Sequence, residues 1–318
     1  MLTTFLATLT PMLVLFLCII IGYVLRVKKI LPEDAGTVMS RLENYCFMPA
    51  LVIGDFMVKC TVSSLKYNYK LLLYSFLGLA VAIIIAIPLS CLFQKKDYYK
   101  RNVYRYALTF GNFGFMGNAI VPAILSWYDA DILYKYLIFT LPLSVAVHTW
   151  GMVLLIPKGK NQQNPLKRLI NPSFISIIIG VILGITGAAK FLPEFVTTTI
   201  GNLKVCMGPV AMLLTGFIIG GYNFKPLLRH YKIYIVTALR LFVLPSVILA
   251  VLMLCKAPDT TLYLALFAFA TPLGMNTVVF PAAYGGDTKT GASMALISHT
   301  LCVITIPIMY ALLTEILK

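Results

Sequence analysis

The chain has 318 residues, of which 60% are hydrophobic and 12% are charged, and its net charge is +15. A soluble domain carries about 25% charged residues, so this composition excludes a soluble globular protein and indicates a polytopic membrane protein. The Lys and Arg residues lie in short segments between apolar runs, which is typical of membrane-protein loops and argues against nucleic-acid binding.

Ten apolar runs follow one another along the chain, each with about the 20 residues needed to cross a bilayer. The first lacks the basic start and cleavage pattern of a signal peptide, so we expect a retained helix. The longest polar loop, 157–171, has Lys and Arg but no acid, and no loop is long enough to fold alone. The predicted spans are 5–25, 37–58, 69–93, 103–126, 132–156, 172–191, 196–221, 231–254, 262–284 and 291–317.

The two halves around this loop, 1–156 and 172–318, resemble each other. The string KILPE at 29–33 recurs as KFLPE at 190–194, CFMP at 46–49 recurs as CMGP at 206–209, and the His–Thr pair at 148–149 recurs at 299–300. Five spans per half force the second half to insert upside down. We therefore predict an all-α membrane protein with ten transmembrane helices in a 5+5 inverted repeat, joined by a short cytoplasmic linker.

Two of the predicted spans, the fourth and the ninth, contain residues that interrupt a helix. Gly costs roughly 1 kcal/mol per helix position against Ala, and Pro about 3 kcal/mol. One reading is a kinked helix with small residues for close packing. The other is a pair of broken helices in matching positions of the two halves, which is the sequence pointer to a transport site. The interrupting residues are Gly111, Gly114, Gly117 and Pro122 in span four, and Pro272, Gly274 and Pro281 in span nine.

A broken helix exposes unpaired N–H groups at the start of its second half, where the helix dipole is positive. Two such ends near the midplane would form a site for a carboxylate. Asn112, Asn118 and Asn276 lie at these breaks and can donate hydrogen bonds without burying a charge. Asn44 either lines the same cavity or satisfies the carbonyls freed by Pro49.

Ionisable residues inside spans are functional candidates by default. Asp55 could bind a cation or proton, or could pair with a Lys in the following loop. Arg240 could meet an anionic substrate or a backbone carbonyl. His148 and His299 could relay protons or could be hydrogen-bonded packing residues.

Arg41 and Glu43 lie near the entry of the second span, where snorkelling to the interface is the favoured reading. The dispersed cysteines form no CxxC pair, so we expect no disulfide, metal or cofactor site. The sequence contains no GxSxG, HExxH or Walker motif, so we expect neither an enzyme nor ATP coupling. The loops on one side carry about twice as many Lys and Arg as those on the other, which predicts a cytoplasmic central loop and outward-facing termini.

The order of these motifs resembles the auxin efflux carrier family, which includes plant PIN carriers and bacterial permeases for malate or malonate. The matching residues are Asn44-x4-Pro49, Gly111-Asn112-x-Gly114-x2-Gly117 with Pro122, and Pro272-x3-Asn276 with Phe280. The resemblance implies a scaffold domain and a transport domain that move as an elevator. It also implies that spans four and nine cross, with Pro122 and Pro281 at the crossing and Asn112 and Asn276 facing an anion. A homodimer is implied by the resemblance alone.

We therefore expect a secondary carrier of small organic anions, such as carboxylates, in the cytoplasmic membrane. The short central loop makes auxin an unexpected substrate, since plant carriers often have a long one. Related bile acid–sodium symporters use acidic residues near the crossing, and none occurs here. The alternative is a sodium- or proton-coupled symporter with Asp55 as coupling site, and a membrane sensor, a lipid-acting enzyme or a channel is more remote.

Overall fold

The computed structural model describes residues 1–157, 170–223, 231–284 and 286–318. The described residues are helical, with no β-strand among them, so the all-α prediction is confirmed. Six helices are long and apolar enough to cross a membrane, and shorter apolar helices accompany them. The chain is thus a polytopic membrane protein, whereas most of the predicted linker lies outside the described residues.

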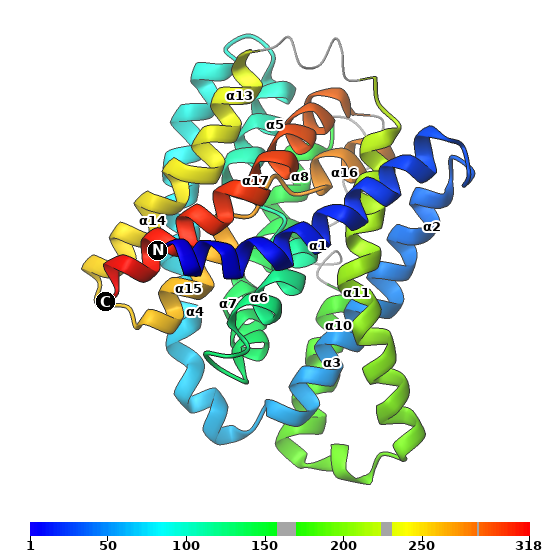
Figure 1. The fold of residues 1–318 in the computed structure, drawn as a ribbon, viewed down its shortest axis with the longest axis vertical. Helices are drawn as coiled ribbons and strands as arrows, with labels where there is room; N and C mark the ends of the chain where they lie inside the picture. The colour runs from blue at the N-terminus through cyan, green and yellow to red at the C-terminus, as the bar shows by residue number, and fades with distance from the viewer. Residues whose placement is uncertain (158–169, 224–230, 285) are drawn as a thin grey trace.

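The first half runs from α1 to α8 (Figure 1). Three of its predicted spans are divided by π-helical segments, labelled η. In chain order the elements are α1 (Leu2–Val27), α2 (Ala35–Leu42), η1 (Glu43–Phe47), α3 (Met48–Lys59), α4 (Val62–Phe93), α5 (Tyr98–Thr109), η2 (Phe113–Gly117), α6 (Asn118–Leu125), α7 (Ile132–Ala146), η3 (Val147–Gly151) and α8 (Met152–Leu155).

In the second half the predicted span 172–191 is too long at its end. Gly187 has a φ of 70°, a left-handed conformation that stops α10, and a short 3-10 helix follows. The elements are α10 (Pro172–Thr186), η4 (Ala188–Phe191), α11 (Glu194–Gly220), α13 (Tyr231–Ala238), η5 (Leu239–Val243), α14 (Leu244–Leu254), α15 (Asp259–Phe269), α16 (Asn276–Tyr284) and α17 (Lys289–Ile316).

Two of the π-helical segments have a local cause in the sequence. η1 ends two residues before Pro49, and η5 ends two residues before Pro245. A proline within a helix lacks an N–H donor, and its ring clashes with the carbonyl four residues earlier. The wider π-turn accommodates this carbonyl, so the helix continues through the proline with a changed register.

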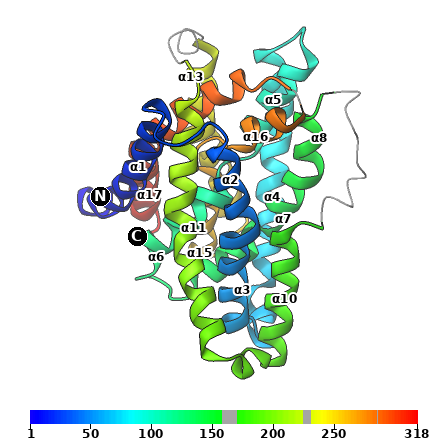
Figure 2. The same cartoon turned by 90° about the vertical axis from the view of Figure 1, so that its right-hand side faces the viewer.

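One group of helices packs with backbone-to-backbone contact. α11 packs against α1 and α3, and α3 also packs against α10. A Cβ at Gly216 of α11 would overlap the Ile19 backbone of α1, and a Cβ at Gly184 of α10 would overlap the Phe56 and Cys60 carbonyls. Small residues allow helices in a membrane to approach this closely. α3, α10 and α11 form the lower part of the molecule (Figures 1 and 2).

Except for α2, which packs against α11, the remaining helices form a second group. α4 packs against α5, α7 and α14, and α17 packs against α13 and α15. Both groups present apolar side chains outward, among them Leu17 of α1 and Ile84 of α4, which suits contact with lipid. The two ends of the chain lie together (Figure 1), where the Met1 amino group donates to Glu315 Oε1 at 2.6 Å.

Candidate functional site

Spans four and nine are both interrupted, and their interruptions meet. α5 ends at Thr109 and α15 ends at Phe269. The non-helical segments that follow run antiparallel, with Gly111 opposite Leu273. The Asn112 N–H donates to the Pro272 carbonyl at 2.7 Å, and the Leu273 N–H donates to Ser298 Oγ at 3.1 Å. The freed backbone groups are thus satisfied by protein, as the interior of a membrane requires.

The close packing at this crossing leaves no room for a side chain at Gly111. A Cβ there would overlap Nη2 of Arg240 and Oγ1 of Thr271. Arg240 is buried in η5, and its Nη1 donates to the carbonyls of Leu108 and Thr109 at 3.1 and 3.3 Å. These are the last carbonyls of α5, at the negative end of the helix, where a cation is stabilising. Of the two predicted alternatives for Arg240, the structure therefore shows the contact with backbone carbonyls.

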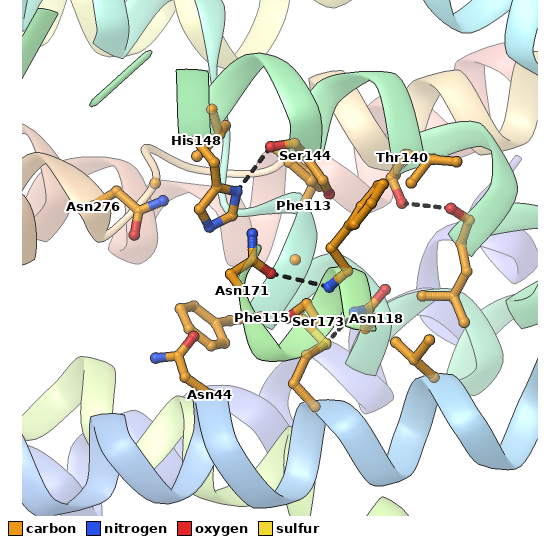
Figure 3. Close-up of a pocket in the computed structure, with 18 of the residues that line it drawn as sticks. Asn44, Phe113, Phe115, Asn118, Thr140, Ser144, His148, Asn171, Ser173 and Asn276 are labelled. Atoms are coloured by element: carbon orange, nitrogen blue, oxygen red, sulfur yellow. Dashed lines mark hydrogen bonds between the residues drawn. The ribbon is translucent and has the colours of Figure 1, made fainter. Parts of the chain in front are cut away.

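A cavity of about 120 Å³ lies beside the crossing (Figure 3). Its polar lining is almost entirely neutral: amides, the hydroxyls of Thr140, Ser144 and Ser173, and one imidazole. Among the described residues no Asp, Glu, Lys or Arg lines it. The amides come from Asn44, Asn112, Asn118, Asn171 and Asn276.

Three helix starts face this crossover cavity. η2 begins directly after Asn112, α16 begins at Asn276, and α10 begins at Pro172 with Asn171 as its N-cap. Asn171 Oδ1 accepts a hydrogen bond from the Phe174 N–H at 3.0 Å. The N–H groups of a first helical turn lack intrahelical partners and carry a partial positive charge. The cavity therefore favours an anion without holding a cationic side chain.

Asn112 and Asn276 each form a hydrogen bond with a side chain from the other half of the chain. Nδ1 of His299 lies 2.8 Å from the Ala295 carbonyl, which can only accept, so Nδ1 carries the proton. Nε2 of the neutral ring then accepts from Asn112 Nδ2 at 3.1 Å. Asn276 Nδ2 donates to the Tyr106 hydroxyl at 3.2 Å. His299 is thus a hydrogen-bonded packing residue that positions Asn112.

Asn118 and Asn44 differ in how well they are satisfied. Asn118 is buried, its Nδ2 lies 3.6 Å from the Met48 sulfur, and its Oδ1 has no partner among the described residues. Asn44 Nδ2 donates to the Ser40 carbonyl at 2.7 Å while the side chain also lines the cavity. Asn44 therefore lines the cavity as one alternative predicted, whereas its hydrogen bond goes to a carbonyl nine residues before Pro49 and not to one that the proline frees. Gly114 lines the cavity too, across from the Met48 methyl group.

His148 is the one imidazole in this lining. Its Nδ1 donates to the Ser144 carbonyl at 2.8 Å, which leaves Nε2 as the ring atom available to a ligand (Figure 3). The seven cysteines are free thiols. No group of metal-binding side chains occurs among the residues that the structure describes.

The three prolines of the predicted site lie differently from the asparagines. Pro272 takes part in the crossing through its carbonyl. Pro122 and Pro281 lie within α6 and α16, beyond the paired segments, and neither lines the crossover cavity. The crossing itself is made by Gly111, Pro272 and Leu273.

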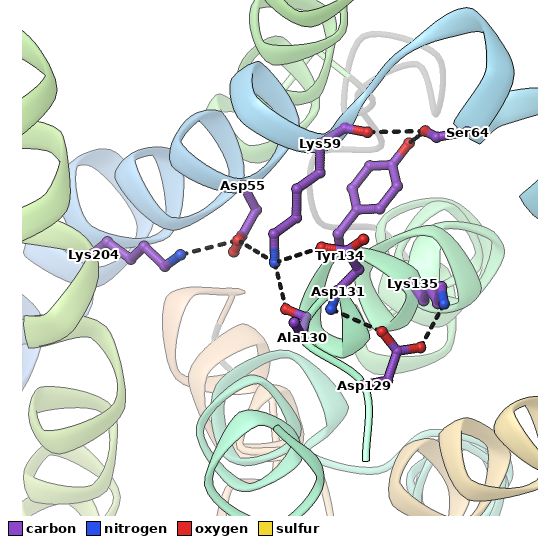
Figure 4. A network of polar contacts seen from close by, with 9 residues as sticks. All are labelled: Asp55, Lys59, Ser64, Asp129, Ala130, Asp131, Tyr134, Lys135 and Lys204. Atoms are coloured by element: carbon purple, nitrogen blue, oxygen red, sulfur yellow. Dashed lines mark hydrogen bonds and ion pairs between the residues drawn. The ribbon is translucent and has the colours of Figure 1, made fainter. Parts of the chain in front are cut away.

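Asp55 lies in a separate cluster of paired charges (Figure 4). Its Oδ1 is 3.0 Å from Lys204 Nζ of α11 and 3.8 Å from Lys59 Nζ at the end of α3. Lys59 also donates to the Ala130 carbonyl at 2.8 Å and pairs with Asp131 at 3.4 Å. Asp55 is buried, and its Oδ2 has no partner within the part of the chain that the structure describes. The predicted pairing with Lys is present, and one partner comes from the other half.

The sequence reading missed two features. Glu43 does not snorkel: it is fully buried in η1, and neither carboxyl oxygen has a hydrogen-bond partner among the described residues. Its neighbour Arg41 is exposed. Asn171 also joins the cavity lining, and the Asn–Pro pair at the start of a span was a recognisable helix-capping signal.

Two further cavities adjoin the crossover cavity, and a third adjoins one of these two. A small one of about 60 Å³ shares Asn44 and Asn276 with it and also reaches Ser40. Ser40 in turn lines a larger cavity of about 610 Å³ with Arg26 and Arg41. On the opposite side a cavity of about 370 Å³ shares Asn118 and contains Asp55, Lys59 and Lys204. The neutral crossover cavity therefore lies between two larger cavities that carry Lys or Arg.

Comparison with known families agrees with this architecture. The sequence matches the family described as membrane transport protein, over residues 7–165 and 160–310. A search of individual curated proteins found no match. The family comprises transporters and not enzymes. Since the matched residues cover nearly the whole chain, the protein belongs to the membrane transport protein family, that of the auxin efflux carriers.

Proposed function

We propose that the protein is a secondary transporter that binds a small organic anion, a carboxylate, in the crossover cavity. The observation that carries the proposal is the lining of amides and helix starts with no ionised side chain among the described residues. Amide and backbone N–H groups stabilise a carboxylate by hydrogen bonds to charged oxygen, worth about 1.5–3 kcal/mol each. Because the donors are neutral, the empty cavity holds no unpaired buried charge.

The packing supports an elevator-like movement. α1, α3, α10 and α11 are in backbone contact through glycines, as a rigid scaffold requires. Both interrupted spans belong to the other helix group, which would carry the crossing and its anion as one transport domain. The cavities on either side would then give the anion access from the two faces of the membrane in turn.

The ten-span inverted repeat, with halves 1–156 and 172–318, provides the symmetry for this movement. The excess of Lys and Arg on one side favours a cytoplasmic central linker, outward-facing termini and insertion in the cytoplasmic membrane. The exposed apolar faces of α1 and α4 suit a lipid bilayer or a second copy of the chain, so a homodimer is compatible with this arrangement.

A symporter coupled through Asp55 is the second candidate. The favourable observation is the unpartnered Oδ2 of Asp55, which lies in the wall of the 370 Å³ cavity. Oxygen ligands are what sodium prefers, but two lysines already neutralise this carboxylate. If Asp55 couples a cation, Asp55→Asn should abolish coupling and retain anion binding.

The test is a thermal-shift screen of the purified protein against L-malate, malonate and acetate, with and without sodium and across pH. A ligand at 100 times its Kd stabilises by about 2.7 kcal/mol. Asn112→Ala and Asn276→Ala should each weaken the best hit about tenfold or more, because each removes a donor to charged oxygen.

Asn68→Ala is the matched control, since Asn68 is a buried amide of α4 that donates to the Ser64 carbonyl and lines none of these four cavities. A shift that survives both cavity substitutions, or that Asn68→Ala removes equally, would place the anion elsewhere. The absence of a shift with every anion would contradict the proposed substrate class.

A further inference from the structure

Glu43 is the buried acid that the anion site does not explain. Its side chain is fully buried within η1, and both carboxyl oxygens lack a hydrogen-bond partner among the described residues. Most buried polar atoms are hydrogen-bonded, so an unsatisfied carboxyl in a membrane span calls for a functional account.

Among the described residues no cation compensates Glu43. η1 packs against α2, α3, α10 and α11, and α10 has no charged residue. Arg41 of α2 is exposed on the wall of the 610 Å³ cavity. Asp55 of α3, which pairs with both Lys59 of α3 and Lys204 of α11, lies about 18 Å further along the span, at 1.5 Å per residue. The remaining charge on these elements, Glu194, lies at the start of α11, beyond Lys204.

Burial of an isolated carboxylate costs so much that the group takes up a proton instead. Within η1 itself the other titratable groups are Tyr45, whose side chain is 72% exposed, and Cys46, and neither supplies a positive charge. The structure therefore shows Glu43 in a setting that requires the neutral carboxylic acid.

A route for this proton lies within one helical turn. Ser40 and Asn44, on either side of Glu43 in sequence, both line the 60 Å³ cavity. That cavity adjoins the crossover cavity at Asn44 and the 610 Å³ cavity at Ser40. A rotation of η1 would bring the carboxyl to this wall, where Glu43 would give its proton to water and become a hydrated carboxylate.

We infer that Glu43 binds and releases a proton that crosses the membrane in the same transport cycle as the anion. An ionised Glu43 would repel an anion bound beside the adjacent Asn44, whereas a protonated one would not. The anion therefore binds best to the protonated protein, and by thermodynamic linkage the proton binds best when the anion is bound. This inference rests on the proposed function and adds a coupling residue to it.

Transport of L-malate into proteoliposomes tests the coupling. The wild-type protein should accumulate L-malate when a pH gradient is imposed. Glu43→Gln, which has the shape of the protonated acid, should retain exchange of labelled for unlabelled L-malate. Its gradient-driven accumulation of L-malate should be at least tenfold lower than that of the wild-type protein. Asp55→Asn removes the other buried acid among the described residues and should retain the gradient dependence.

A second measurement reads the proton directly. The infrared carbonyl band of a protonated carboxylic acid should be present in the wild-type protein and in Asp55→Asn, and missing in Glu43→Gln. An unchanged band, or gradient-driven accumulation by Glu43→Gln at the wild-type level, would overturn the inference. If the wild-type protein exchanges L-malate without any dependence on the pH gradient, the coupling alone is overturned. If the wild-type protein transports none of L-malate, malonate and acetate, the proposed function is overturned as well.

Discussion

The molecule contains two polar clusters that are built on opposite principles. The cluster around Asp55 consists of ionised groups in pairs, Lys204 on one side and Lys59 with Asp131 on the other (Figure 4). The polar lining of the crossover cavity is neutral and rich in amides (Figure 3), and Oδ1 of Asn118 has no partner among the described residues. Paired charges fix segments that are far apart in the sequence, whereas neutral groups with spare hydrogen-bonding capacity leave room for a charged ligand.

The largest effect on stability should follow from Asp55→Ala. The substitution leaves Lys59 and Lys204 without their shared partner, and loss of one member of a buried pair costs about 2–3 kcal/mol when the lysines keep some access to water. The measurement is denaturant unfolding in detergent. Glu315→Gln, in an exposed pair with the N-terminus, should change the free energy of unfolding by less than about 0.5 kcal/mol.

Gly111→Ala should disrupt the crossover cavity instead of the charged cluster. The added methyl group overlaps Arg240 and the Thr271 side chain, so we expect a loss of about 1–3 kcal/mol in unfolding free energy together with loss of anion binding. Gly201→Ala is the matched control, because Gly201 lies inside α11 with open space around it and should gain up to about 1 kcal/mol. Equal effects of both substitutions would mean that the crossing does not need Gly111.

A smaller effect than that of Asp55→Ala or Gly111→Ala should come from Lys59→Ala. Lys59 joins α3 to the segment before α7 through Ala130 and Asp131, but its side chain is partly exposed. We therefore expect about 0.5–1 kcal/mol, decreasing as salt is added. Measuring the unfolding free energy at low and high ionic strength checks this. A salt-independent loss would show that the apolar stem of Lys59, and not its charge, makes the contribution.

The sequence predicts what depends on local chemistry. Runs of apolar residues mark the spans, and the density of glycine, asparagine and proline marks both interruptions. Asn112, Asn118 and Asn276 reach one cavity because the two interruptions cross, which paired breaks in two halves already suggest.

Contacts between distant residues were beyond the sequence reading. Lys204 reaches Asp55 across 149 residues, and Arg240 reaches Leu108 across 132 residues. Such pairs depend on how helices pack, which no spacing along the chain reveals. Glu43 was misread for the same reason: two residues from an exposed Arg41 it looked interfacial, and only the packing of η1 against α11 shows that it is buried.

The π-helical segments have a mechanical consequence. A π-turn holds one residue more than an α-turn, and this surplus residue can migrate along a helix by exchanging one hydrogen bond at a time. Each step turns the residues that it passes by about 100° while the helix keeps its length. In η1 such a step would swing Glu43 and Asn44 past the cavity wall while α2 and Lys59 stay anchored. The η1 part of the second span would then rotate about the helix axis while both ends of the span stay in place.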